Sequence, residues 1–320
     1  MKGPSTAPTP ASTRPGYVRA SSVSRALAAV GDRWSLLILA AAFQGTKRFE
    51  EWRQGIGISS NILTTRLERL VRLGSLRKVA VAGGARRREY RLTPMGTDFF
   101  PTALMFWRFD RLWSRRRARQ PATLTHTTCG KVMSPTLTCG HCGIAVRARN
   151  VRYLDGPGAG FERLPPPKRS RRSNMTLDDR AELSMLVGES IDIIGDRWTQ
   201  QVLSTFFLGA RRFEDIRARC GVATNILADR LKLLVEHGLL QRRVCVTSPR
   251  HFEYVLTPKG MDVYPIVLTL MKWGDRWLAG KAGPPLILRC NHCDHVLDAV
   301  VLCDQCGGAL DSHDVSFRRG

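Results

Sequence analysis

The chain has 320 residues, and its 50 lysines and arginines against 27 aspartates and glutamates give a formal net charge of +23. This excess indicates a polyanionic partner such as double-stranded DNA, because each phosphate that a basic side chain neutralises releases counterions. A merely soluble basic protein is the alternative. The sequence has no run of about 18 apolar residues, which excludes a transmembrane helix and predicts no membrane partner.

Residues 1–20 are rich in Pro, Ser, Thr and Ala and contain no apolar segment. This composition predicts a disordered tail and not a secretory signal. We therefore expect a cytoplasmic, nucleoid-associated protein, in which the nine cysteines serve as metal ligands or free thiols rather than as disulfides.

The two halves of the sequence repeat each other. A shift of 164 residues brings them into register without a gap. The repeated positions include GDRW at 31–34 and 195–198, RFE at 48–50 and 212–214, NIL at 61–63 and 225–227, LTP at 92–94 and 256–258, and Trp113 and Trp277. Two repeats are too few for a solenoid, so the pattern indicates a tandem duplication of a two-part unit.

The repeat predicts six segments along the chain. They are a disordered tail (1–20), a first helical domain (21–120), a first cysteine module (121–155), a basic linker (156–178), a second helical domain (179–283) and a second cysteine module (284–316). The linker is rich in Pro and Gly and has almost no apolar content. Its run of Lys and Arg is either a solvated tether or a further contact to DNA backbone.

The first copy predicts a series of helices followed by a hairpin. In chain order they are a helix over 22–30, a buried helix over 34–43, a third helix after Arg48, a fourth over 59–74, strands at 76–81 and 88–92, and a last helix up to Trp113. Thr93 is the expected N-cap of the last helix, with Pro94 at its first position.

The helix over 59–74 is the predicted DNA-reading element. Leu63, Leu67, Leu70 and Val71 form one apolar stripe, while the opposite face is polar. Ser59 or Ser60 is expected to cap its start through a side-chain oxygen, and a glycine at 74 to end it. A helix of this kind can lie with its back on a small core and its front against base edges in a major groove.

Helix, helix, turn, reading helix and basic hairpin together predict a winged helix-turn-helix, in which the hairpin tip contacts the flanking DNA backbone. Winged helices also serve as protein-interaction modules, but the basic tip and the charge balance favour DNA. The candidate DNA-binding residues are Ser59, Ser60, Asn61, Thr64, Thr65, Arg66, Arg69, Arg86, Arg87 and Arg88 in the first copy and Thr224, Asn225, Asp229, Arg230, Arg250 and His251 in the second.

The ordered motifs W-x-x-x-(I/V)-L, G-x-(K/R)-R-F-E, N-I-L-x-x-R-L and E-Y-x-L-T-P-x-G resemble those of the HxlR family of bacterial transcriptional regulators, over 22–117 and again over 189–281. The resemblance implies a winged-helix DNA-binding regulator that pairs through its first and last helices. Surplus aromatic residues on 99–113 and 264–277 suit such a pairing surface. Because two domains are fused, the implied homodimer is either replaced by a pseudo-dimer within one chain or added to it.

The two copies differ in charge and in their reading helices. Residues 25–120 hold 20 basic and 7 acidic residues, whereas residues 180–283 hold 15 and 11. Thr65 of the first reading helix corresponds to Asp229 in the second, and a carboxylate accepts from a cytosine amino group but repels phosphate. We therefore expect the first copy to carry more of the DNA affinity, and the second to read other bases or mainly to support pairing.

The second cysteine module has zinc-ribbon spacing. Cys290-x2-Cys293 and Cys303-x2-Cys306 are two knuckles that can place four thiolates around one zinc ion, with a strand-forming stretch between them. Four protein ligands leave no open position, so the predicted site is structural and not catalytic. A redox dithiol pair is the alternative.

The first module, with Cys129, Cys139 and Cys142, is one cysteine short. The repeat register aligns Cys290 with His126, which predicts a second zinc site of one histidine and three cysteines. His141 is the rival fourth ligand, and a degenerate ribbon without metal is the other alternative. The predicted fold class is therefore mainly α with small β-wings (α+β), two winged helix-turn-helix domains each followed by a small zinc ribbon, with up to two structural zinc ions.

Two cysteines remain, Cys220 and Cys245, and we expect both to be small buried hydrophobic residues. The function predicted is a sequence-specific regulator of transcription, most simply a repressor. A non-specific architectural DNA-binding protein and a zinc- or redox-responsive sensor of unknown effector are the alternatives. No HExxH or H-x-E with CxxC is present, and no open metal site is predicted, so we do not expect an enzyme.

Overall fold

The computed structural model describes residues 17–80, 88–114, 123–163, 188, 190–245 and 248–318. The chain divides into two compact units, each built from separate stretches. Unit 1 consists of Met1–Ala28, Leu137–Ser170 and Arg197–Val300, and unit 2 of Ala29–Thr136, Arg171–Asp196 and Val301–Gly320. No described helix by itself is long and apolar enough to cross a membrane; helices α1 (Ser22–Val30) and α2 (Arg33–Phe43) meet that measure only when counted together across an 81° bend.

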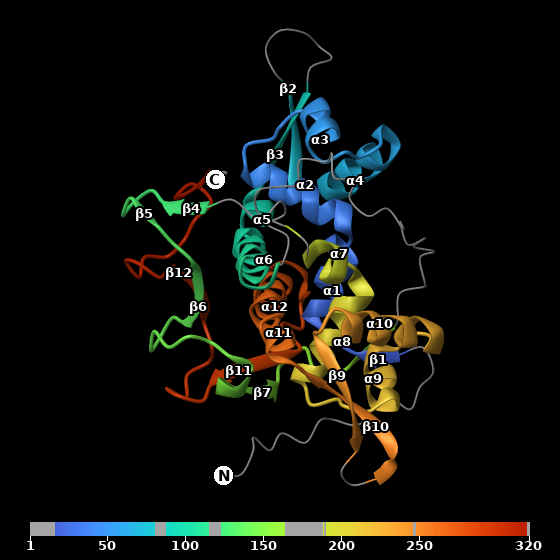
Figure 1. Ribbon diagram of the computed structural model, residues 1–320. Helices are drawn as coiled ribbons and strands as arrows, with labels where there is room; N and C mark the ends of the chain where they lie inside the picture. Colours follow the sequence, from blue (N-terminus) through green and yellow to red (C-terminus); the bar gives the residue numbers. More distant parts are fainter. Residues whose placement is uncertain are drawn as a thin grey trace. The chain divides into compact units, whose positions relative to one another are not determined.

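Unit 2 contains the first winged helix-turn-helix (Figure 1). Its elements are α2 (Arg33–Phe43), α3 (Phe49–Gly55), α4 (Ser60–Leu73), β2 (Leu76–Ala80), β3 (Arg88–Leu92), α5 (Pro94–Thr97) and α6 (Phe100–Trp113). The apolar stripe of α4 is buried as predicted, with Leu63, Leu67 and Leu70 fully enclosed. Trp52 of α3 is also fully buried, and its indole N–H donates to the carbonyl oxygen of Ile38 at 3.2 Å, which ties α3 to α2.

The sequence-based elements of this domain agree with the structure except at two helix ends. The predicted last helix is two helices, because Thr93 and Pro94 start only the short turn α5 before α6 begins at Phe100. The N-cap of α4 is Ser59, but its side chain makes no capping hydrogen bond. The N–H groups of the first turn of α4 are therefore not capped by that side chain, contrary to the prediction.

Unit 1 contains the second winged helix-turn-helix in the same order. Its elements are α8 (Arg197–Phe207), α9 (Phe213–Cys220), α10 (Thr224–Glu236), β9 (Leu240–Cys245), β10 (Ser248–Leu256), α11 (Pro258–Met261) and α12 (Tyr264–Leu278). The hairpin β9–β10 pairs antiparallel from Leu240 opposite Leu256. The elements repeat because the apolar positions, the Thr-Pro start and the turn residues repeat.

The first helix of each copy is exchanged between the units. In unit 1, the start of α1 (Ser22–Val30) contacts α12: Ser22 Oγ donates to Asp275 Oδ1 at 2.5 Å, and Arg25 donates to the carbonyl oxygen of Ala279 at 3.1 Å. A Cβ on Gly274 would lie 2.5 Å from the carbonyl oxygen of Ser22, so this close approach requires glycine.

In unit 2, the corresponding helix of the second copy, α7 (Ser190–Ile194), packs against the first domain. The buried carboxylate of Asp110 in α6 accepts hydrogen bonds from the backbone N–H and the hydroxyl of Ser190, at 2.7 and 2.5 Å. Arg33 forms an ion pair with Asp192 at 3.1 Å. Each unit therefore contains a first helix from one copy and a last helix from the other.

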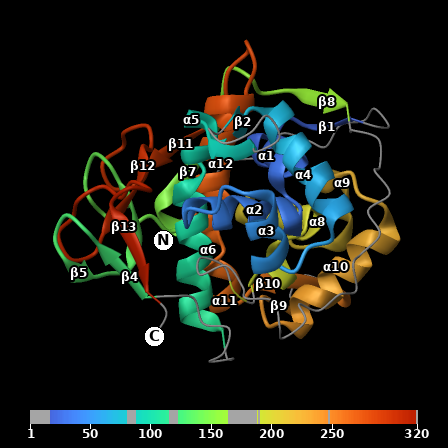
Figure 2. The same ribbon diagram turned by 90° about the horizontal axis from the view of Figure 1, so that it is seen from above.

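Strands of the cysteine modules are exchanged in the same way. In unit 1, β7 (Val151–Asp155) pairs antiparallel with β11 (Leu286–Cys290). In unit 2, β13 (Val315–Arg318) pairs with β4 (Thr123–His126), which also pairs with β5 (Lys131–Val132), as Figure 2 shows. The other two strands of the cysteine modules are β6 (Pro135–Cys139) and β12 (Ala299–Cys303). Each leads from the first knuckle of its module to the second, and the chain does not reverse between the two knuckles.

The ends of the predicted tail and the start of the predicted linker are ordered in unit 1. β1 (Tyr17–Arg19) pairs antiparallel with β8 (Phe161–Arg163). Val18 is buried there, and Arg25 forms an ion pair with Glu162 at 3.0 Å. These strands therefore lie within the predicted tail and linker, because they are held by contacts between residues far apart in the sequence, which a composition average does not register. The rest of the tail (1–16) and the basic run of the linker lie outside the described residues.

Candidate nucleic-acid interface and metal centres

The exposed face of α4 is short and polar. Most of the predicted reading residues on this helix are solvent-exposed: Ser59, Ser60, Asn61, Thr64 and Thr65. The Thr65 hydroxyl donates to the backbone carbonyl of Asn61 at 2.9 Å, which fixes the orientation of that side chain. Amide and hydroxyl groups on an exposed helix face are the groups that discriminate base edges.

Two of the predicted DNA contacts on α4, Arg66 and Arg69, also make ion pairs within the domain. Arg66 donates to Asp32 Oδ1 at 2.9 Å, and Arg69 forms an ion pair with Asp32 Oδ2 at 3.2 Å. Asp32 also caps α2 by accepting from the Ser35 backbone N–H at 3.1 Å. Arg66 and Arg69 are half-buried, and their ion pairs with Asp32 hold the reading helix to the start of α2. The repeated GDRW motif contained the signal for this, because its Asp is spaced to cap the helix that follows.

The wings are described only in part. Arg88, at the start of β3, is exposed beside the wing, whereas Arg86 and Arg87 lie outside the described residues. In the second wing, the side chains of Arg250 and His251 are likewise outside them. Lys78 of β2 lies over the ring of Tyr90 at 5.6 Å, so the base of the first wing carries a positive charge held by an aromatic ring.

The second reading helix, α10, presents the matching positions. Thr224, Asn225 and Asp229 are exposed, and Arg230, at the position of Arg66, is half-buried. The N-cap of α10 is Ala223, whose side chain cannot accept a hydrogen bond. Thr224 is the first residue of the helix and is therefore not its N-cap. Both reading helices therefore begin with exposed polar residues and with first-turn N–H groups that their N-cap side chains do not satisfy.

The eight predicted metal ligands lie in two groups that can each hold a metal ion. One group is His126, Cys129, Cys303 and Cys306, and the other is Cys139, Cys142, Cys290 and Cys293. The expectation that each copy closes its own site was therefore wrong, since each group takes one knuckle from each copy. The physical reason lies in the segments between the knuckles, which run on as β6 and β12 instead of reversing.

Each group lies within one unit, and its geometry fits a tetrahedral ion. In unit 1, Cys139 Sγ is 3.8 Å from Cys293 Sγ, and Cys142 Sγ is 3.9 Å from Cys290 Sγ. A tetrahedral zinc with bonds of about 2.3 Å separates its sulfurs by roughly 3.8 Å. In unit 2, His126 Nδ1 lies 3.3 Å from Cys306 Sγ.

All four knuckles fold alike. The residue after the second ligand donates its N–H to the carbonyl of the first ligand, at 2.8–2.9 Å, and has positive φ. This residue is Gly130, Gly143, Gly307 or, in one knuckle, Asp294 with φ of 56°. Glycine there avoids the Cβ strain of the left-handed region. The glycine after the cysteine was a further sequence signal for these knuckles.

The His126 knuckle shares this turn, which places the buried imidazole at the position of a cysteine. Its rival His141 points elsewhere, because its ring stacks on His295 with centroids 4.3 Å apart. A hydrogen bond from the Lys131 backbone lowers the pKa of the Cys129 thiol to about 7, which favours the thiolate that binds metal. The residues present therefore suit a soft divalent cation such as zinc.

The two cysteines outside these groups are buried. Burial raises the pKa of the Cys220 thiol to about 12, so it stays protonated and unreactive. Cys245 is also buried, and Arg212 donates to its sulfur at 3.5 Å. Both are small packed residues, as the sequence predicted.

Comparison with known proteins identifies the repeated domain. A family model described as HxlR-like helix-turn-helix matches residues 29–117 and 193–282. An uncharacterised HTH-type transcriptional regulator of Mycobacterium tuberculosis is 42% identical over 137 residues, which are 43% of this chain and 87% of that protein. Another such protein, from Bacillus subtilis, is 30% identical over 101 residues, which are 31% of this chain and 94% of the relative.

A solved structure of a candidate transcription factor of Pseudomonas aeruginosa shares 26% identity, with a TM-score of 0.32, and covers 41% of this chain and 89% of its own. The two stretches matched by the family model together exceed half of the chain, and each contains one reading helix and one wing. The chain therefore belongs to the HxlR family of helix-turn-helix proteins and carries the domain of that family twice.

Proposed function

We propose that this protein regulates transcription by binding double-stranded DNA with two reading helices, α4 and α10, at an operator of two unequal half-sites. The observation that carries the proposal is the pair of exposed polar faces that begin α4 and α10, each supported by a packed winged helix-turn-helix. Two reading helices in one chain call for half-sites about one helical turn, or 10 base pairs, apart, or a multiple of that spacing.

The half-sites differ because the reading faces differ. The first helix presents Thr65, whereas the second presents Asp229 at the same position. A carboxylate accepts a hydrogen bond from a cytosine amino group, while a threonine hydroxyl already bound to the Asn61 carbonyl presents mainly its methyl group. The operator is therefore an imperfect inverted or direct repeat, and the more basic first copy supplies more of the affinity.

The two copies act as a pseudo-dimer within one chain. Support comes from the exchanged helices, since α1 packs on α12 in unit 1 and α7 on α6 in unit 2. A second chain is then not required for two reading helices. Repression follows when the footprint of such a protein overlaps a promoter.

Each metal group binds one structural zinc ion. Sulfur–sulfur distances of 3.8 and 3.9 Å and the four matching knuckles support this assignment. When bound, zinc would cross-link two knuckles and hold the strands β7 and β11, or β4 and β13, in place. Its four ligands leave no position for substrate, so the role is in folding.

The test is affinity selection of fragmented source-genome DNA by the zinc-loaded protein at physiological salt, with the footprint length recorded. We expect a few enriched sites that contain two unequal half-sites. Even enrichment over the whole genome would overturn specific regulation and favour an architectural DNA-binding protein.

Matched variants assign the reading helices on the selected operator. Asn61→Ala should raise the Kd for the operator by roughly 5- to 100-fold with little change for random duplex, because about 1–3 kcal/mol of base discrimination is lost. Arg88→Ala should weaken both duplexes alike, since a wing contact reaches the backbone. Asn225→Ala should relax only the other half-site. Equal losses on operator and random duplex for Asn61→Ala would refute its role in reading bases.

A further inference from the structure

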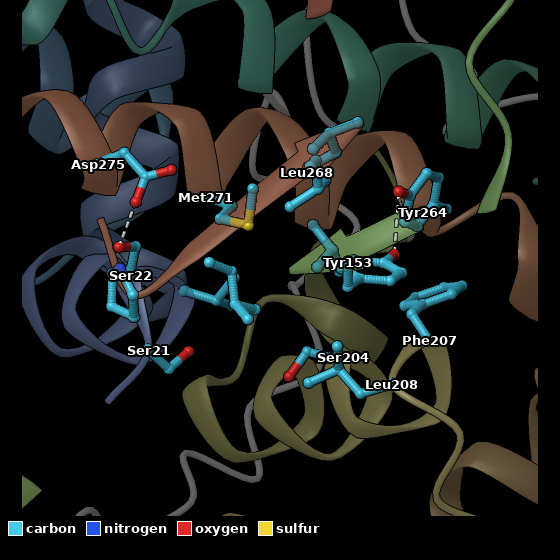
Figure 3. A pocket seen from close by; sticks show the side chains of 15 residues that line it. Ser21, Ser22, Tyr153, Ser204, Phe207, Leu208, Tyr264, Leu268, Met271 and Asp275 are labelled. Carbon is cyan, nitrogen blue, oxygen red and sulfur yellow. Dashed lines mark hydrogen bonds between the residues drawn. The ribbon is translucent and has the colours of Figure 1, made fainter. Parts of the chain in front are cut away.

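Unit 1 contains a cavity lined by α1, α8, α12 and the strands β7 and β11 (Figure 3). Leu268 and Met271 of α12 lie on one side, and Ser204 of α8 and Leu208, which follows that helix, lie on the other. The volume open to the centre of a water molecule is about 40 Å³, which is room for about three waters as it stands. Met271 is unbranched and can change rotamer, so the cavity can widen without movement of the backbone.

The wall is apolar except at two ends. At one end the Tyr153 hydroxyl donates to the Tyr264 hydroxyl at 3.0 Å. At the other end Ser22 donates to Asp275, whose pKa is raised by burial. Of the described residues that line the cavity, Asp275 is the only one with an ionisable carboxylate or a basic group, and it is already hydrogen-bonded. An anionic ligand would therefore lose its hydration without gaining a counter-charge, and the Asp275 carboxylate that could attract a cation already interacts with Ser22 and Arg25.

The tyrosine pair offers a hydrogen-bond donor to a ligand in the cavity. Burial raises the pKa of Tyr153 to about 12 and that of Tyr264 well above its usual value, so both hydroxyls stay protonated. Tyr264 accepts from Tyr153, and no described residue accepts the hydrogen of Tyr264 in turn. A buried hydroxyl hydrogen without an acceptor is costly, and an oxygen of a ligand would satisfy it.

The residues that line the cavity differ from their counterparts in unit 2. In the repeat register Met271 corresponds to Trp107, Tyr264 to Phe100 and Tyr153 to Phe317. Trp107 and Phe100 are both buried in unit 2. Unit 2 thus has a larger side chain where unit 1 has a flexible thioether, and phenyl rings where unit 1 has tyrosine hydroxyls. The two units have therefore diverged at this place, with bulkier and less polar side chains in unit 2 than in unit 1.

We propose that this cavity binds a small, neutral, single-ring molecule that carries a hydroxyl group, of the phenol class. The ring lies among Leu268, Met271 and Leu208, and its oxygen accepts the hydrogen bond of Tyr264. The site is separate from the DNA-reading faces and from the metal groups. Binding there can be measured without DNA, so its failure is distinguishable from failure of the proposed regulation.

The experiment titrates phenol, toluene and benzoate into the full-length, zinc-loaded chain and records binding by ligand-observed NMR and calorimetry. We expect saturable binding of phenol with a Kd on the order of 1 mM, weaker binding of toluene, and none of benzoate. Absence of saturable phenol binding, or binding of benzoate as tight as that of phenol, would overturn the proposal.

Two variants copy the residues of the first copy into the second. Tyr264→Phe should weaken phenol roughly 3- to 10-fold and leave toluene unchanged, because only a hydrogen bond is lost. Met271→Trp should abolish binding of both, because the indole fills the cavity. Met261→Trp is the matched control, since Met261 is 38% exposed and outside the cavity, and it should bind phenol as the unchanged protein does.

Circular dichroism shows whether each variant is folded. If Met271→Trp does not fold, the Tyr264→Phe comparison decides, because phenylalanine occupies the same place in the first copy. Equal weakening of phenol and toluene by Tyr264→Phe, or unchanged phenol binding in folded Met271→Trp, would show that the ligand binds elsewhere.

Discussion

A single glycine in the L-T-P-x-G motif explains why that motif repeats. A Cβ on Gly96 would lie 2.1 Å from the carbonyl oxygen of Ser75, which is far inside van der Waals contact with backbone. The Thr93 backbone N–H donates to that same carbonyl at 3.1 Å, and the Thr93 hydroxyl caps α5 through the N–H of Gly96. The motif therefore packs the residues that follow β3 closely against Ser75, which follows the reading helix α4. In the second copy, a Cβ on Gly260 would lie 2.1 Å from the carbonyl oxygen of Leu239.

We predict that Gly96→Ala destabilises unit 2 by about 2 kcal/mol or more, because backbone must move to admit the methyl group. Chemical denaturation followed by tryptophan fluorescence measures this loss. Gly55→Ala is the control, since a Cβ added there would meet nothing within 4 Å and its helix α3 favours alanine. If both variants unfold at the same denaturant concentration, the close approach at Gly96 is not rigid.

Residue types gave good predictions where chemistry is local. The apolar stripe of α4, the turn glycine at 74 and the Thr93 cap depend on neighbours within a few residues, and the structure has them. The roles of Arg66 and Arg69 depend on Asp32, more than thirty residues away, so a helix pattern could not reveal that these charges are already paired.

At the scale of elements, the metal groups show what sequence spacing leaves open. The nine-residue interval between knuckles is the same in both copies, and either grouping supplies four ligands of suitable type. Which knuckles share a metal ion depends on whether the chain between two knuckles of one copy folds back on itself or continues as a strand. Residues 131–138 and 295–302 contain no glycine to support a tight reversal, and the structure has strands there.

The zinc content of two double variants distinguishes the groupings. Cys139→Ser with Cys293→Ser should leave one zinc per chain, because both ligands belong to one group. Cys290→Ser with Cys303→Ser should remove both ions, because the two ligands belong to different groups. Mass spectrometry of the metal in purified protein gives the counts. The reverse pair of results would mean that each copy closes its own site.

At the scale of the whole molecule, each unit depends on both copies. A cut after Ser170 would give fragments 1–170 and 171–320, and each unit includes stretches of both fragments. Two kinds of contact join one fragment to the other. They are the helix contacts of Ser22 and Ser190, and the pairing of strands β7 with β11 and β4 with β13.

We predict that a chain with a protease site inserted after Ser170 stays associated after complete cleavage. The fragments should elute together from size-exclusion chromatography at micromolar concentration and separate only in denaturant, because their shared cores must first be exposed. The uncut chain is the control for elution volume. Two separate peaks in buffer would show that each copy folds independently.

The exchange of helices and strands has a consequence for the descent of this protein. A half-length ancestor could bury the same surfaces only by pairing with an identical chain, whereas fusion made the partner a permanent neighbour. After the fusion neither half could be deleted, because each buries surfaces of the other, but the two halves no longer had to keep the same sequence. The change to Asp229 on one reading helix and the open cavity beside Met271 are changes that a symmetric ancestor would have had to accept on both sides at once.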